Sequence, residues 1–123
     1  MSKRNYNKIS FWEPIIGNQE IKLINQALKM NWPNEGFFTS QFEKKIEKIL
    51  KVKHAICTTS GTISIFLALK AIGIKDKDEV IVPDITFGAT AMAVKLANAK
   101  LVIADINQKN LSFDFKDLKK KIS

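Results

Sequence analysis

The stretch TTSGTISIFLALKAIG, residues 58–73, decides how this chain folds. Residues 54–58 read as a short buried strand, because so short an apolar run suits a strand rather than a helix. Residues 63–72 contain no helix breaker and are apolar almost all round, which predicts a buried helix that ends at Gly73. The stretch therefore predicts a strand, a tight turn and the N-terminus of a helix.

The turn of this predicted unit carries three hydroxyl side chains and one glycine: Thr59, Ser60, Gly61 and Thr62. The first N–H groups of a helix have no internal partner, and the helix dipole adds partial positive charge there. A glycine lets a ligand approach the backbone closely. These features suit a phosphate group, although Ser60 or Thr59 could also serve only as the helix cap.

Composition and charge indicate which classes of protein and of partner fit this chain. The 123 residues, 46% of them apolar, are typical of a globular domain with a hydrophobic core. The net charge of +8 could indicate nucleic-acid binding, but Arg4 is the only arginine, and base-edge recognition depends heavily on arginine. We therefore expect neither a nucleic-acid nor a membrane partner. A single cysteine and a polar N-terminus without a signal peptide's apolar core make the cytoplasm the expected location.

Strand and helix patterns alternate through the second half of the chain. After the helix at 61–72, the sequence predicts a strand at 79–83, a helix at 87–98 and a third strand at 101–105. Such an alternation is typical of right-handed crossovers in a parallel sheet, and continuous apolar strands fit a sheet covered on both faces. We therefore predict an α/β fold with a parallel sheet.

Three further helices are predicted from polar residues that can cap a helix. Their caps are Asn18, then Thr39 or Ser40, and finally Asp114. Residues 1–17 are expected to form an N-terminal arm, and residues 18–123 a single domain.

Ligands of open parallel sheets bind beyond the carboxyl ends of the strands. Two features follow predicted strands here: the hydroxyl-rich turn at 58–62, and the segment 83–87, which places Phe87 just beyond its strand. A phosphate site beside a flat ring suits a planar, phosphorylated aromatic ligand. Phe87 could instead pack in the core at the start of a helix. No metal site is predicted.

Five short motifs stand together in this region. They are Ser60-Gly61-Thr62, DEVIVP at 78–83, Thr86-Phe87, AKLV at 99–102, and Asp105. Together they resemble the sugar aminotransferases of the DegT/DnrJ/EryC1/StrS type, over about residues 9–123; the joint pattern is specific, although each motif alone is weak. The resemblance implies the large domain of a fold type I pyridoxal-phosphate enzyme, three layers around a parallel sheet, with only its first part present.

The resemblance also implies a function and a cofactor site. Members of this family act as homodimers with pyridoxal 5'-phosphate. They move an amino group, usually from glutamate, onto a nucleotide-linked keto sugar, in cell-surface polysaccharide or amino-sugar biosynthesis. By position, Ser60, Gly61 and Thr62 would bind the cofactor phosphate, and Phe87 would stack on the pyridine ring.

The chain departs from the family pattern in two ways. Ile63-Ser64-Ile65 follow the phosphate motif where alanine and leucine are usual, which affects packing more than chemistry. The chain also stops before the aspartate that pairs with the pyridine nitrogen and before the Schiff-base lysine. No catalytic residue is therefore predicted within it, and the chain alone is expected to be inactive.

Two other functions stay open. A dehydratase of the same family, in which histidine replaces the Schiff-base lysine, differs at a position outside this chain. A non-catalytic phosphate- or nucleotide-binding α/β module would use the same binding residues. Against this module, the chain contains neither a complete Walker sequence nor a glycine-rich dinucleotide fingerprint.

Overall fold

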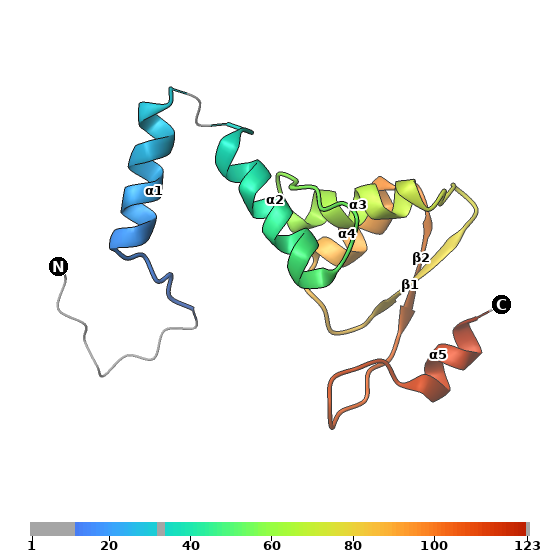
Figure 1. Cartoon of the computed structure of the whole chain (residues 1–123). Coiled ribbons are helices and arrows are strands. Elements are labelled where there is room, and N and C mark those ends of the chain that lie inside the picture. Colours follow the sequence, from blue (N-terminus) through green and yellow to red (C-terminus); the bar gives the residue numbers. More distant parts are fainter. Residues whose placement is uncertain (1–11, 32–33, 123) are drawn as a thin grey trace. The chain divides into compact units, whose positions relative to one another are not determined.

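The computed structural model describes residues 12–31 and 34–122, and the chain divides into two compact units, Met1–Ile56 and Cys57–Ser123 (Figure 1). Most of the N-terminal arm predicted for residues 1–17 lies outside the described residues. Within the described ranges, no helix combines the length and the apolar character that crossing a bilayer requires.

The described residues of the first unit form two helices, α1 (Asn18–Lys29) and α2 (Phe37–Leu50). Both begin after a glycine, Gly17 and Gly36, instead of at the polar residues that the sequence favoured. Asn18 is already the first residue of α1, and Thr39 and Ser40 lie inside α2, so these predicted caps were wrong. They were missed because glycine has no capping side chain to recognise, and its backbone adopts the cap conformation readily.

At the start of α1, the carboxylate of Glu20 accepts a hydrogen bond from the backbone N–H of Gly17 over 2.7 Å. Backbone hydrogen bonds from Glu20 itself and from Gly17 lower the pKa of the Glu20 carboxyl from its ordinary value of 4.5. Because the folded-state pKa is the lower one, the carboxylate stabilises α1 above the unfolded-state pKa. This contribution is lost as the pH falls through the folded-state pKa.

We expect the Glu20 carboxyl to titrate below 4.5 in an NMR pH titration. The amide proton of Gly17 should shift over the same pH range, because it donates to that carboxylate. In the Glu20→Gln variant, the Gly17 shift should lose this pH dependence. A Glu20 midpoint at or above the ordinary value would contradict the hydrogen-bonded start of α1.

The second unit contains the alternating helices and strands that the sequence predicts. Its elements are α3 (Gly61–Ala71), β1 (Glu79–Pro83), α4 (Ala89–Leu96), β2 (Lys100–Ala104) and α5 (Phe115–Lys121). Strands β1 and β2 lie side by side (Figure 1) and run parallel, with Ile81 opposite Val102. Beyond β1, the N–H of Asp84 extends the ladder by donating to the carbonyl of Ala104 over 2.9 Å. The predicted α/β fold with a parallel sheet is confirmed.

The core of this unit is small and centres on α4. Val82, Val94 and Ala99 are buried together, and four partly buried side chains pack against them: Leu69, Ile74, Val80 and Leu101. Helix α4 packs on both strands and on α3, while α5 lies against β2. Ala93 of α4 and Ala97, directly after it, are fully covered, which indicates that small side chains allow this helix to approach its neighbours closely.

Helices α3 and α4 end in the same way. After α3, Gly73 has a φ of +85°, and the N–H of Ile74 donates to the carbonyl of Leu69 over 3.1 Å. After α4, the N–H of Ala99 donates to the carbonyl of Val94 over 3.2 Å, again past a residue with positive φ. This is the Schellman motif, in which a left-handed residue stops the helix. Val94 and Ala99 belong to the core cluster, and Leu69 and Ile74 pack against it, so the end of each helix also directs the chain toward the core.

Two predictions were wrong, one for the segment that leads into the second unit and one for helix α3. Residues 54–58 form no strand, because the described residues provide no hydrogen-bonded partner beside them, and a strand exists only as part of a ladder. Helix α3 is confirmed as a helix, but none of its residues is buried. It packs mainly on α4, so other apolar side chains, such as that of Leu67, remain exposed. The second helix and third strand are confirmed with slightly shifted ends.

Candidate functional site

Ser60 is the N-cap of α3, directly before the first helical residue, Gly61. Its backbone is extended, with φ −165° and ψ 161°, and its side-chain oxygen accepts a hydrogen bond from the N–H of Ile63 over 3.3 Å. The predicted helix start is therefore confirmed, as is the capping role considered for Ser60. The expectation that this turn follows a strand was wrong, since residues 54–58 form none. The N–H groups of Gly61 and Thr62 are among the first of the helix, which have no carbonyl partner one turn earlier.

The space beside Gly61 is open. A β-carbon built on Gly61 would meet no atom within 4 Å apart from those of its two chain neighbours and of the helix's own backbone. Orphan N–H groups, the positive end of the helix dipole, and the hydroxyls of Thr59 and Thr62 belong to the same turn. Helix N-termini of this kind bind anions, so the residues present fit a phosphate group in both chemistry and space.

Three possible donors lie within hydrogen-bond distance of the carbonyl oxygen of Ser60. They are the N–H of Ser64 at 3.0 Å, the hydroxyl of Thr58 at 3.0 Å and the hydroxyl of Ser64 at 3.2 Å. The two hydroxyls also contact each other, at 2.6 Å. Sequence reasoning treated Ser64 only as a packing difference. Its spacing, four residues after Ser60, was the available signal, because a helical serine can bond the carbonyl one turn earlier.

Phe87 lies between β1 and α4, and its side chain is 85% exposed. Its carbonyl accepts a hydrogen bond from the N–H of Thr90 over 3.0 Å, and the hydroxyls of Thr86 and Thr90 are 2.9 Å apart. Such exposure argues against the alternative that Phe87 packs in the core at the start of the helix. The stacking of this ring on a cofactor stays a prediction.

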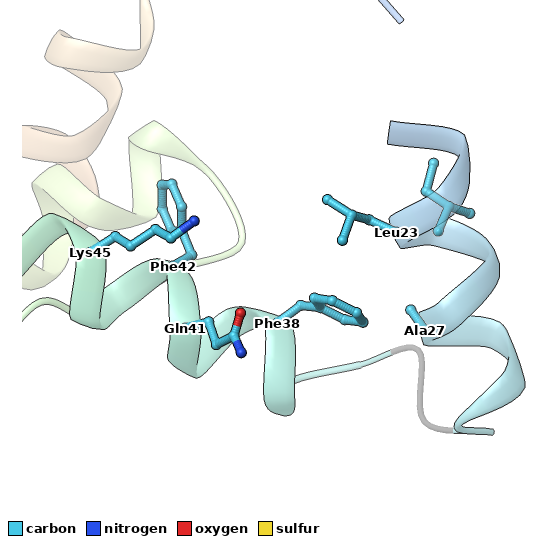
Figure 2. A pocket seen from close by; sticks show the side chains of 7 residues that line it. Leu23, Ala27, Phe38, Gln41, Phe42 and Lys45 are labelled. Carbon is cyan, nitrogen blue, oxygen red and sulfur yellow. The ribbon is translucent and has the colours of Figure 1, made fainter. Parts of the chain in front are cut away.

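A separate hollow lies in the first unit, between α1 and α2 (Figure 2). Its volume is about 370 Å³, and it is lined by Leu23, Ile24, Ala27, Phe38, Gln41, Phe42 and Lys45. Figure 2 shows the Phe38 ring pointing from α2 toward Ala27 of α1. The lining is mostly apolar, with Lys45 as its one charged side chain, and it includes none of the predicted cofactor residues. The hollow is therefore not the candidate phosphate site.

A family model described as the DegT/DnrJ/EryC1/StrS aminotransferase family matches residues 14–123. The chain belongs to this family. The matched region includes the turn at Ser60, Gly61 and Thr62 as well as Phe87, so every residue proposed for the cofactor lies within the DegT-family region.

Two relatives have similar sequences. The spore coat polysaccharide biosynthesis protein SpsC of Bacillus subtilis is 38% identical over 114 residues, which are 93% of this chain and 29% of SpsC. The GDP-perosamine synthase of Vibrio cholerae is 34% identical over 116 residues, which are 94% of this chain and 32% of that enzyme. This DegT-family chain thus spans less than a third of the length of these relatives.

A solved structure agrees with this assignment. The PLP form of Spr1654 from Streptococcus pneumoniae matches with a TM-score of 0.87 at 27% identity. The match covers 94% of this chain and 29% of Spr1654. The fold of this DegT-family chain therefore matches part of a fold type I enzyme that binds PLP.

Proposed function

We propose that this chain is the N-terminal part of a pyridoxal-phosphate-dependent aminotransferase that transfers an amino group from glutamate to a nucleotide-linked keto sugar. The observation that carries the proposal is the start of α3, where orphan N–H groups and hydroxyls adjoin the open space at Gly61. The names of SpsC and of GDP-perosamine synthase support a sugar substrate and a role in polysaccharide biosynthesis. Within the same proposal, the full-length protein is a cytoplasmic homodimer.

Each proposed binding residue has a separate task. The N–H groups of Gly61 and Thr62 donate to the phosphate oxygens, and the hydroxyl of Thr62 adds another donor. The Ser60 oxygen accepts from Ile63, which leaves its own hydroxyl proton available for the phosphate. Phe87 presents its exposed ring to the flat face of the pyridine. When bound, pyridoxal phosphate supplies the electron sink that amino transfer requires.

The test is an assay of the full-length protein with pyridoxal phosphate, isotope-labelled glutamate and a panel of nucleotide-linked keto sugars. We expect mass spectrometry to find the labelled nitrogen in one of the sugars. A sugar that loses a hydroxyl without gaining nitrogen would show a dehydratase of the same family instead. Binding of nucleotides without any binding of pyridoxal phosphate would favour the non-catalytic module.

A further inference from the structure

The two hydroxyls that reach the Ser60 carbonyl stand on opposite sides of the turn. Thr58 precedes the turn, and Ser64 lies in the first turn of α3, so the carbonyl is held from both directions. The main-chain bond from the N–H of Ser64 adds a third donor at 3.0 Å. A carbonyl oxygen has only two lone pairs, so the main-chain donor and one of the two hydroxyls fill its acceptor capacity.

A count of the hydroxyl protons shows that at least one hydroxyl can always donate to the Ser60 carbonyl. Thr58 and Ser64 have one hydroxyl proton each, and three short contacts join their oxygens and the carbonyl. If one hydroxyl donates to the other, the second can still donate to the carbonyl. In every such arrangement, the Ser60 carbonyl keeps a hydroxyl donor in addition to the main-chain donor.

The position of this carbonyl determines where the next N–H points. The peptide between Ser60 and Gly61 is planar and trans, so its C=O and its N–H point in opposite directions. Holding the oxygen against α3 therefore directs the N–H of Gly61 outward from the helix start. The backbone could otherwise rotate readily here, because Gly61 is the least restricted residue type.

We propose that Thr58 and Ser64 are positioning residues of the phosphate site: their hydroxyls orient the Ser60–Gly61 peptide so that the Gly61 N–H faces the phosphate. This inference rests on the proposed function of the α3 start. Neither hydroxyl needs to touch the ligand. Both act through the Ser60 carbonyl, and their contribution should depend on the presence of a phosphate group in the ligand.

Two substitutions remove the hydroxyls with little change in shape or in the main chain. Thr58→Val is nearly isosteric, and Ser64→Ala keeps the N–H that donates to Ser60. In the full-length protein, we expect the two substitutions together to weaken binding of pyridoxal 5'-phosphate about three- to tenfold, the range for one neutral hydrogen bond. Either substitution alone leaves the Ser60 carbonyl its other hydroxyl donor and should weaken binding less. Binding of pyridoxal, which lacks the phosphate, should not change. Both affinities are measured on the apo form from the visible absorbance of the bound ligand.

Two further kinds of variant serve as controls: substitutions that keep the hydroxyl, and a substitution outside the turn. Thr58→Ser and Ser64→Thr keep a hydroxyl and should restore the affinity for pyridoxal 5'-phosphate. Ser112→Ala is the matched control, since it removes an exposed hydroxyl that bonds Asn110 over 2.8 Å in a loop outside the turn. It should leave both affinities unchanged.

The outcomes separate this inference from the function on which it rests. Equal losses for pyridoxal 5'-phosphate and pyridoxal would show a general structural role for the hydroxyls and overturn the inference. An unchanged affinity in the double variant Thr58→Val/Ser64→Ala would overturn it as well, while the phosphate site itself would stand. If the unmodified protein binds pyridoxal 5'-phosphate no better than pyridoxal, the phosphate site fails and the inference fails with it.

Discussion

Replacing Thr62 by alanine in the full-length protein is expected to lower its affinity for pyridoxal phosphate by roughly ten- to hundredfold. Thr62 is the second residue of α3, beside the open space at Gly61, and its hydroxyl would donate to the phosphate. A hydrogen bond to a charged group contributes about 1.5–3 kcal/mol, and each ~1.4 kcal/mol changes an affinity tenfold. Since the backbone N–H groups remain, binding should persist, and activity should largely recover in excess cofactor.

The measurement is a titration of activity against added pyridoxal phosphate for both proteins. Thr62→Ser is the matched control, because it keeps the hydroxyl and should keep most of the affinity. An unchanged half-saturation in Thr62→Ala would mean that Thr62 is only a residue of the helix start. The proposed phosphate contact would then be withdrawn for this side chain.

The substitution Val94→Asp should destabilise the second unit by about 3–5 kcal/mol, the cost of an uncompensated buried charge. Val94 is only 1% exposed, and it packs with Val82 and Ala99 in the core cluster. A natural domain is typically stable by about 5–15 kcal/mol. The substitution should therefore remove a large share of the stability of a unit whose core is small.

The control lies on the same helix. Met92 is 56% exposed, so Met92→Asp introduces the same charge into α4 without burying it. Urea unfolding followed by circular dichroism should give a much lower midpoint for Val94→Asp and a small change for Met92→Asp. Similar losses in the two variants would contradict the placement of the core around Val94.

Helix starts were predictable where a side chain makes the cap. The oxygens of Ser60 and Asp114 accept bonds from N–H groups only two or three residues later, so the signal is local. The caps at Gly17 and Gly36 were missed because a glycine cap has no side-chain signal. Glycine indicates a break in a pattern without saying whether a helix begins or ends there.

Strands were predictable in the part of the chain that also contains their partner. The strands predicted at 79–83 and 101–105 pair with each other. The second strand begins and ends one residue earlier than predicted, at Lys100–Ala104. The run at 54–58 is also short and contains apolar residues, yet it has no partner among the described residues. Pairing depends on distant segments, so the pattern of a single run cannot ensure it. The exposure of α3 has the same origin, since burial also requires neighbours.

In the candidate site, too, some residues could be identified from the sequence and others could not. Ser60, Gly61 and Thr62 were identified because residue types at a helix start have known chemistry. The roles of Thr58 and Ser64 depend on the direction of two hydroxyls around one carbonyl, and rotamers are not determined by composition. Four-residue spacing makes such a bond possible without requiring it.

The Schellman motifs at the ends of α3 and α4 have a consequence for the order of folding. Each closes between residues five positions apart, whereas the paired residues Glu79 and Lys100 are 21 positions apart. Local contacts form faster than distant ones, and helices of this size form within about a microsecond. The helix ends should thus be in place before the strands pair. A side chain at Gly73 that resists positive φ would accordingly slow refolding of this unit, because the chain would leave α3 in the wrong direction before β1 could meet β2.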